Sequence, residues 1–181
     1  IKGKEQEFAI YIIYGTATML VIGVQNCVYG FTLNVKEKKY FLTHNNIKIP
    51  ENGNIFSINE ANNQSIDQEI LSYLTFCKSL NLDGKRTHTS RFIGSLVADF
   101  HRNMLKGGIF IYPNTADKPN GQLRLIYECN PIALIASMAN GISSNKYKDI
   151  LEITPKNNHE RISFIVGSKK MVHKLLSFYE K

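Results

Sequence analysis

The chain has 181 residues, of which 43% are hydrophobic, and its 22 Lys and Arg outnumber its 15 Asp and Glu to give a net charge of +7. It is long enough to bury one hydrophobic core and too short for two ordinary domains, and no apolar run approaches the roughly 20 residues that span a bilayer, which excludes a membrane-spanning protein. The basic residues are scattered rather than gathered in a patch, which argues against nucleic-acid binding and favours a small anionic ligand held by a few cations.

The first part of the sequence predicts β-strands that follow one another as a meander. β-Branched and aromatic runs alternate with short polar or glycine-containing turns. The predicted strands are Phe8–Tyr14, Met19–Val24, Tyr29–Leu33 and Tyr40–Leu42. The asparagine-rich stretch Glu51–Ser65 is then expected to be an irregular connection, although the apolar residues Ile55–Ile58 interrupt it.

Helical periodicity begins at Ser65. Ser65 and Gln68 match a capping box, and the apolar residues that follow recur at helical spacing, so a helix is predicted that ends near Leu80. A polar loop over residues 81–90 leads to a second predicted helix, Ser95–Lys106, which two glycines terminate.

In the remainder of the chain, strands alternate with helices. We expect strands at Ile109–Tyr112, Leu123–Tyr127 and Ile162–Val166, a turn-rich loop at Pro113–Gly121, a helix at Ile132–Ala139 that Asn130 and Pro131 start, and a last helix that Ser168 caps. This alternation predicts an α/β fold in which a mixed β-sheet is flanked by helices.

Glu128 occupies a position where ligands often bind. It follows the predicted strand Leu123–Tyr127 and precedes the helix that Asn130 starts, and in open α/β sheets anions gather where strands end and helices begin. A carboxylate there supplies an oxygen ligand for Mg²⁺, or it only complements the helix dipole. The spacing by itself favours the second interpretation.

Arg91 lies at a similar junction, ahead of Gly94 and Ser95 at a predicted helix start. An arginine offers a planar, bidentate fork to a phosphate, and a glycine lets the backbone approach a ligand closely. The alternative is an ordinary loop arginine beside an ordinary helix cap, and the residues alone do not decide between the two.

The histidines and cysteines do not indicate a metal site. The five histidines lack the spacing of a metal-binding pair, and His101 is expected to pack between helices or lie at the surface. Cys27, Cys77 and Cys129 are odd in number and have no CxxC spacing, so we expect small core residues in a protein of a reducing compartment. The chain starts abruptly and without an initiator Met, so we expect it to be a fragment of a longer protein.

Several segments together form a longer pattern. They are Tyr14–Leu20 (YGTATML), Phe56–Glu60 (FSINE), Arg91–Arg102 (RFIGSLVADFHR), Gly107–Pro113 (GGIFIYP) and Asn120–Pro131 (NGQLRLIYECNP). In this order and with nearly this spacing they resemble the C-terminal half of the fructose-1,6-bisphosphatases, over about Ile10 to Glu180. The resemblance implies the C-terminal half of a layered α-β-α-β-α sandwich, with residues 1–181 as one sugar-phosphate-binding domain and a metal- and AMP-binding N-terminal domain outside this chain.

The resemblance also implies a set of substrate-binding positions, in which Asn59, Tyr112 and, from a neighbouring subunit, Arg91 contact the 6-phosphate. Gly94–Leu96 match a helix start whose backbone meets the sugar hydroxyls. The full set is Asn59, Asn62, Arg91, Phe92, Gly94, Ser95, Leu96, Tyr112, Gln122, Leu123 and Arg124.

Arg124 and Glu128 are the catalytic residues that the resemblance implies. Arg124 matches an arginine near the 1-phosphate, and Glu128 matches the one metal-binding carboxylate of this half, which favours the metal-ligand interpretation. The implied cofactor is Mg²⁺, with Mn²⁺ or Zn²⁺ as alternatives. The implied partners are fructose 1,6-bisphosphate, the protein's own N-terminal domain and further copies in a dimer of dimers, in the cytoplasm and without nucleic acid or membrane.

Three positions depart from the family pattern. Asn62 and Phe92 replace tyrosines, and Gln122 replaces a lysine that contacts the sugar phosphate. Each change removes a donor to an anion, and such a hydrogen bond contributes roughly 1.5–3 kcal/mol. Lys118 and Arg86, in the flanking loops, are candidates to compensate.

The resulting hypothesis is the substrate-binding half of a Mg²⁺-dependent fructose-1,6-bisphosphatase of gluconeogenesis, inactive without its other half. Two alternatives stay open: a non-catalytic relative kept for assembly or regulation, and an enzyme that prefers sedoheptulose 1,7-bisphosphate. The replaced phosphate donors motivate the first of these.

Overall fold

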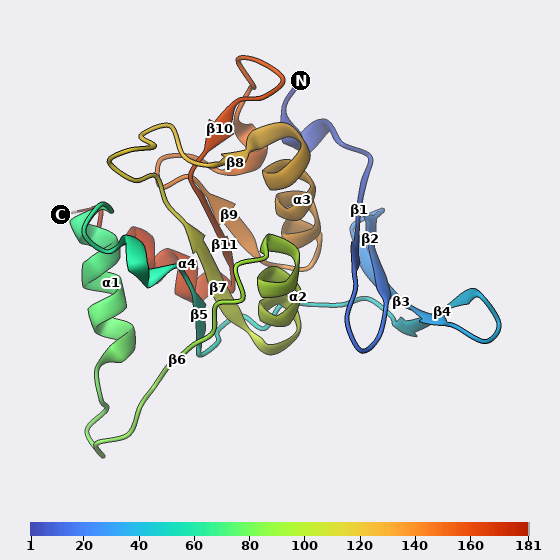
Figure 1. Cartoon of the computed structure of the whole chain (residues 1–181), viewed down its shortest axis with the longest axis horizontal. Coiled ribbons are helices and arrows are strands. Elements are labelled where there is room, and N and C mark those ends of the chain that lie inside the picture. The colour runs from blue at the N-terminus through green and yellow to red at the C-terminus, as the bar shows by residue number, and fades with distance from the viewer. Residues whose placement is uncertain (181) are drawn as a thin grey trace.

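Two main β-sheets organise the chain in the computed structural model, which describes residues 1–180 (Figure 1). The first sheet follows a short 3₁₀ turn, Gly3–Glu5, and is an antiparallel meander of β1 (Phe8–Ile13), β2 (Met19–Val24), β3 (Cys27–Asn34) and β4 (Lys39–His44) in that order. The predicted meander is therefore confirmed. Gln25 and Asn26 join β2 to β3 with φ values of 50° and 60°, which is the backbone that a two-residue hairpin turn requires.

The second sheet is mixed, as expected. Its strands lie in the order β6 (Thr89–Ser90), β5 (Ile55–Ser57), β7 (Gly108–Tyr112), β11 (Phe164–Gly167) and β9 (Ile142–Ser144). β5 runs parallel to both β6 and β7, whereas β11 is antiparallel to β7 and β9. A separate ribbon pairs β8 (Leu123–Arg124) with β10 (Arg161–Ile162).

Helices cover both faces of the second sheet (Figure 1). α1 (Gln68–Lys78) and α4 (Lys169–Leu176) cover one face, and α2 (Leu96–Lys106) and α3 (Asn130–Met138) fill the space between the other face and the meander. The side chains of β7 alternate between the two covered faces of the sheet: Ile109 and Ile111 pack on the α1 side, and Phe110 packs on the α2 side. The α/β class is thus confirmed, with the layers in the order sheet, helices, sheet, helices. Among the described residues, no helix has the length and apolar character to cross a bilayer.

The expectation of an irregular connection over Glu51–Ser65 is wrong at its apolar centre. Residues Ile55–Ser57 form β5, which lies between two parallel neighbours and is almost fully buried. A buried parallel strand shows no polar alternation, so only its apolar character marks it, and three residues make a weak signal. Thr89–Ser90, expected in a polar loop, form the edge strand β6 because they pair with β5.

The capping box at Ser65 is also wrong. α1 begins at Gln68 after Asp67, and the Ser65 hydroxyl donates to the Asn62 carbonyl at 3.0 Å. Ser168 precedes α4 as expected, but its hydroxyl accepts the amide N–H of Gly108 at 3.1 Å and caps no helix amide. By contrast, Ser95 caps α2 as predicted, accepting the Ala98 N–H at 3.5 Å.

The strand predicted at Leu123–Tyr127 ends at Arg124. Residues Leu125–Cys129 form a π-helical turn that runs directly into α3, and Asn130 has helical angles (φ −60°, ψ −46°), so it is not the N-cap. Pro131 has no N–H for the regular i→i−4 bond, and the turn before it closes instead through the Asn130 N–H and the Leu125 carbonyl. The strand predicted at Ile162–Val166 divides at Ser163 into β10 and β11.

Candidate functional site

The candidate site begins where β5 and β6 end side by side. Phe56 of β5 is paired with Ser90 of β6, and the N–H of Arg91 donates to the Phe56 carbonyl at 2.9 Å. Asn59 lies two residues beyond β5, so two segments more than 30 residues apart in sequence leave the sheet together. The carboxyl ends of parallel strands are where ligands bind in open α/β sheets.

A small cavity brings several predicted residues together at this edge. Asn59, Asn62, Tyr112 and Gln122 line it together with Ile111 and Pro113. These residues come from three segments: the turn after β5, the end of β7 and the residue before β8. All of the hydrogen-bonding side chains in the lining are uncharged amides or a phenol, so the cavity offers donors to an anion without a formal charge of its own. The expectation that each replacement removes a donor is therefore wrong at Asn62 and Gln122, because an amide NH2 also donates; the charge at Gln122 is what is lost there.

Lys118 does not line this cavity but places a positive charge beside Gln122, which does. Its ammonium donates to the Gln122 Oε1 at 3.3 Å. Arg86, the other cation considered for compensation, borders a different cavity of about 440 Å³ with Phe56 and His88. Of the two candidates, Lys118 is the one that the structure brings to the altered position.

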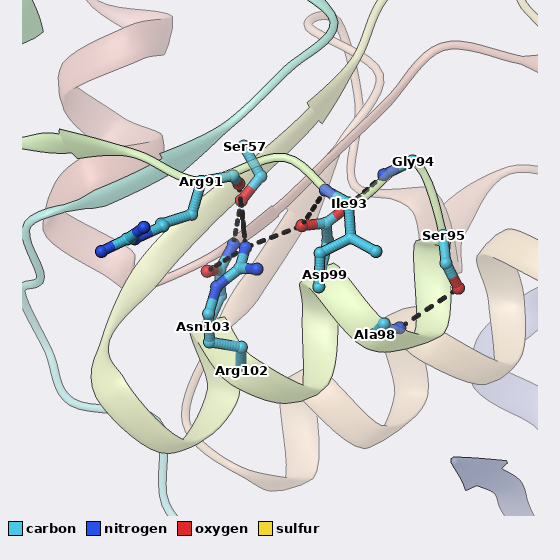
Figure 2. A network of polar contacts seen from close by, with 9 residues as sticks. All are labelled: Ser57, Arg91, Ile93, Gly94, Ser95, Ala98, Asp99, Arg102 and Asn103. Atoms are coloured by element: carbon cyan, nitrogen blue, oxygen red, sulfur yellow. Dashed lines mark hydrogen bonds and ion pairs between the residues drawn. The ribbon is translucent and has the colours of Figure 1, made fainter. Parts of the chain in front are cut away.

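The segment from Arg91 to Ser95 is held by a network of polar contacts (Figure 2). The buried carboxylate of Asp99 accepts N–H bonds from Ile93, at 3.0 and 3.1 Å, and from Gly94, at 3.1 Å. Gly94 has a φ of +86°, a conformation that favours glycine. The side chain of Arg91 is exposed, and in Figure 2 it points away from the network.

Arg102 completes the network from the next turn of α2. Its Nη2 lies 2.7 Å from the Asp99 carboxylate, 2.7 Å from the Ser57 hydroxyl and 2.9 Å from the Arg91 carbonyl. Neither Asp99 nor Arg102 was singled out from the sequence, since an acidic and a basic residue three apart on a helix are common. Phe92 and Leu96, in the same region, pack at the margin of the core.

Arg124 and Glu128 lie together at the π-helical turn. Glu128 Oε2 accepts the backbone N–H of Arg124 at 2.7 Å, and the Arg124 guanidinium lies 3.6 Å from the same oxygen. The carboxylate therefore stands at the start of this turn and not at the N-terminus of α3. Leu123, which precedes Arg124 in β8, is half-buried against the core.

Glu128 offers part of a metal site. Its side chain is 29% exposed, so one carboxylate is open to a further partner, and carboxylate oxygens are ligands that Mg²⁺ prefers. Within residues 1–180, no group of three or more His, Cys, Asp or Glu side chains could hold a metal ion. A metal at Glu128 would need its other ligands from outside the described residues.

One of the five histidines and two of the three cysteines are buried. His101 is buried and contacts the meander through Tyr11, so it does not pack between helices as expected. Cys77 and Cys129 are buried in the core, as expected, whereas Cys27 is only partly buried and belongs to neither core cluster, so the expectation is wrong for Cys27. Burial, and then the charge of Glu128, raise the pKa of Cys129 well above its usual value.

A larger cavity lies outside the predicted site. It measures about 690 Å³ and is bordered by Asn114, Lys146, His159 and Arg161 among others. None of the predicted site residues lines it, although its loop residues Asn114 and Pro119 belong to the same loop as Lys118. Size alone therefore does not mark the cavity where the predicted residues meet.

Comparisons with known proteins agree on one family. Residues 49–180 match the family model described as "Fructose-1-6-bisphosphatase, C-terminal domain". A class 1 fructose-1,6-bisphosphatase of Cytophaga hutchinsonii is 48% identical over 178 residues, which are 98% of this chain and 51% of that protein. The crystal structure of Leishmania major fructose-1,6-bisphosphatase in holo form matches with a TM-score of 0.95 and 35% identity, over 100% of this chain and 59% of that one. The chain thus spans about half the length of the curated relative that it matches.

Proposed function

Because this chain belongs to the fructose-1,6-bisphosphatase family, we propose that it is the substrate-binding half of an enzyme that hydrolyses fructose 1,6-bisphosphate to fructose 6-phosphate and phosphate, a reaction of gluconeogenesis. One observation carries the proposal: Asn59, Asn62, Tyr112 and Gln122 line one cavity at the carboxyl end of β5 and β7. We propose residues 1–181 as one sugar-phosphate-binding domain that works beside an N-terminal metal- and AMP-binding domain.

The 6-phosphate binds at the mouth of this cavity in this proposal, because the interior of about 10 Å³ is too small for it. Asn59 and Tyr112 donate hydrogen bonds to it, as do the amides of Asn62 and Gln122, and Lys118 supplies the cation that Gln122 lacks. The contact of 3.3 Å between the Lys118 ammonium and the Gln122 Oε1 supports this role. Leu96, Leu123 and the backbone of Gly94 and Ser95 border the sugar.

Arg91 serves a neighbouring subunit in this proposal. Its guanidinium is exposed and points away from the contacts of its own segment, which suits an arginine that reaches a second copy of the chain (Figure 2). The site is then complete only in an oligomer, for which we propose a dimer of dimers. Phe92, beside Arg91, adds apolar contact but no hydroxyl.

The reacting end of the substrate lies at Arg124 and Glu128 in this proposal. Glu128 would hold one divalent ion, Mg²⁺ or alternatively Mn²⁺ or Zn²⁺, together with carboxylates of the N-terminal half. A bound divalent ion neutralises phosphoryl oxygens and lowers the pKa of an attacking water. Arg124 stabilises the developing charge on the 1-phosphate, and anchoring of the distal phosphate positions the reacting one.

A phosphatase assay of the full-length protein with fructose 1,6-bisphosphate and Mg²⁺ tests this proposal. The assay is run near neutral pH, since we propose a cytoplasmic enzyme. We expect release of phosphate by the full-length protein and none by residues 1–181 alone. No turnover by a folded oligomer would support the non-catalytic alternative, for which the only motive is the replacement of donors at Asn62, Phe92 and Gln122. A higher kcat/KM for sedoheptulose 1,7-bisphosphate would show that the substrate is misassigned.

A further inference from the structure

One guanidinium nitrogen joins the two segments that leave the sheet at the candidate site. Arg102 Nη2 donates to the Ser57 hydroxyl at 2.7 Å and to the Arg91 carbonyl at 2.9 Å. Ser57 is the last residue of β5 and stands two residues before Asn59, whereas Arg91 follows β6 directly. Beside the backbone bond from the Arg91 N–H to the Phe56 carbonyl, a side chain from neither segment therefore also holds the two together.

Asp99 fixes this guanidinium and the far end of the Arg91 segment at once. Its carboxylate, which has no exposed surface, lies 2.7 Å from Arg102 Nη2 and accepts the N–H groups of Ile93 and Gly94 (Figure 2). The carbonyl of Arg91 and the amide of Ile93 are therefore both fixed, on either side of Phe92. The backbone that directs the Arg91 side chain outward has little freedom to turn.

Stability alone does not account for a buried ion pair at this place. The desolvation of two charges often cancels their attraction, and apolar residues of similar volume frequently serve a core equally well. A guanidinium does something that an apolar residue does not, because the two N–H groups of Nη2 lie in a fixed plane and hold acceptors of both segments in fixed directions.

We infer that Asp99 and Arg102 are positioning residues, which hold the segment that leads to Asn59 in its own subunit and set the direction in which Arg91 leaves toward the phosphate-binding end of the neighbouring subunit's site. This inference rests on the proposed function. The inference adds two residues that touch no substrate to the proposed function. It also gives a physical reason why the side chain of Arg91 points outward.

The test uses the full-length enzyme and the variants R102K, R91A and R102K/R91A. Lysine keeps the charge near Asp99, but its ammonium sits on a flexible stem and rotates freely, so it does not fix the directions of the acceptors. R102K is therefore expected to raise the KM for fructose 1,6-bisphosphate about tenfold and to change kcat by less than about threefold. If Arg102 acts through Arg91, the fold-increase in KM of the double variant is well below the product of the fold-increases of the two single variants. Independent, multiplicative effects would overturn the inference.

The variant K146M is the matched control. Lys146 forms an ion pair of 2.6 Å with Asp67, and their side chains are 13% and 26% exposed, against 22% and 0% for Arg102 and Asp99. K146M is expected to lower the melting temperature without a change in KM. If R102K behaves like K146M, the network is only structural and the inference fails.

Two further outcomes keep the inference separate from the proposed function. Absence of turnover by the wild-type enzyme defeats the proposed function itself, whereas normal turnover with a normal KM in R102K defeats only the inference. If R102K does not fold, S57A replaces it, because it removes one acceptor of Arg102 and leaves the ion pair. An unchanged KM in folded S57A would then overturn the inference, and a raised KM that is not multiplicative with R91A would support it.

Discussion

The hydroxyl of Tyr11 lies 2.8 Å from Nδ1 of His101, and this contact joins the first strand of the meander to α2. Both side chains are buried. Burial, and then the nearby His44, lower the pKa of His101, while burial raises the pKa of Tyr11. A neutral imidazole and a neutral phenol therefore share this hydrogen bond. Protonation of His101, the residue next to Arg102, thus affects a contact between two layers of the fold.

The first prediction concerns pH and stability. The folded-state pKa of His101 lies below the value of about 6.5 for an unfolded histidine, so the unfolded chain takes up a proton first as the pH falls. The contribution of His101 is present above pH ~6.5 and is lost as the pH falls below it. We expect urea unfolding to show less stability at pH 5.5 than at pH 7.5.

The variants H101N and Y11F assign this pH dependence. H101N keeps a polar group near the position of Nδ1 and does not titrate, so the difference in stability between pH 7.5 and 5.5 should shrink. Y11F keeps the titrating histidine but leaves its Nδ1 unpaired, at a cost of roughly 1–3 kcal/mol at pH 7.5. An undiminished pH dependence in H101N would place the responsible proton elsewhere.

A second prediction concerns Lys118. Removal of its charge in K118M is expected to raise the KM for fructose 1,6-bisphosphate in the full-length enzyme about tenfold, because a charge-assisted hydrogen bond contributes about 1.5–3 kcal/mol. In the proposed reaction the distal phosphate takes no part in bond cleavage, so kcat should change little.

The variant Q122K in the K118M background provides the rescue. It places a cation at the position where Lys118 now brings one, so KM should return toward the wild-type value. K170M is the control, since Lys170 is an exposed lysine paired with Glu51 on another part of the surface. An unchanged KM in K118M would mean that the cavity receives its positive charge from elsewhere, such as the Arg91 of a second subunit.

The features that the sequence predicted well are those that local physics determines. Strand alternation and the turn at Gln25 and Asn26 predicted the meander, and Ser95 and Gly107 set the ends of α2. β5 was missed because a short buried strand shows no periodicity, and the π-helical turn at Leu125–Cys129 was read as a strand because its apolar residues suit either structure.

Some residues of the candidate site could likewise be predicted from the sequence, and others could not. Asn59, Tyr112 and Gln122 were found through a resemblance of sequence segments, and the structure brings them to one cavity. The role of Arg102 was not visible, since its partner Ser57 is 45 residues away and the two meet only through the fold. No local pattern records that kind of contact.

A third prediction concerns thiol reactivity. The thiolate is the nucleophile in alkylation, and burial raises the pKa of Cys77 to about 11 and that of Cys129 well above its usual value. Iodoacetamide at pH 8 should therefore modify Cys27, which is partly exposed, well before the other two. Peptide mass spectrometry of samples with and without urea provides the measurement, and fast labelling of Cys129 in the folded protein would mean that the π-helical turn opens readily.

The last prediction decides between the two interpretations of Glu128. In E128Q the amide oxygen still accepts the Arg124 N–H, which the carboxylate now accepts at 2.7 Å, so the turn should keep its shape. If Glu128 is a metal ligand, loss of its charge in the full-length enzyme should lower kcat by at least about a hundredfold and raise the Mg²⁺ concentration needed for half-maximal rate. Binding of fructose 6-phosphate, measured by calorimetry, should stay close to that of the wild type because the distal cavity is untouched. If the carboxylate only complements the dipole of the turn, E128Q should lose no more than about 1 kcal/mol of stability and keep its rate. The rate and the metal dependence together therefore separate the two roles, and a normal rate in E128Q would remove Glu128 from the catalytic site.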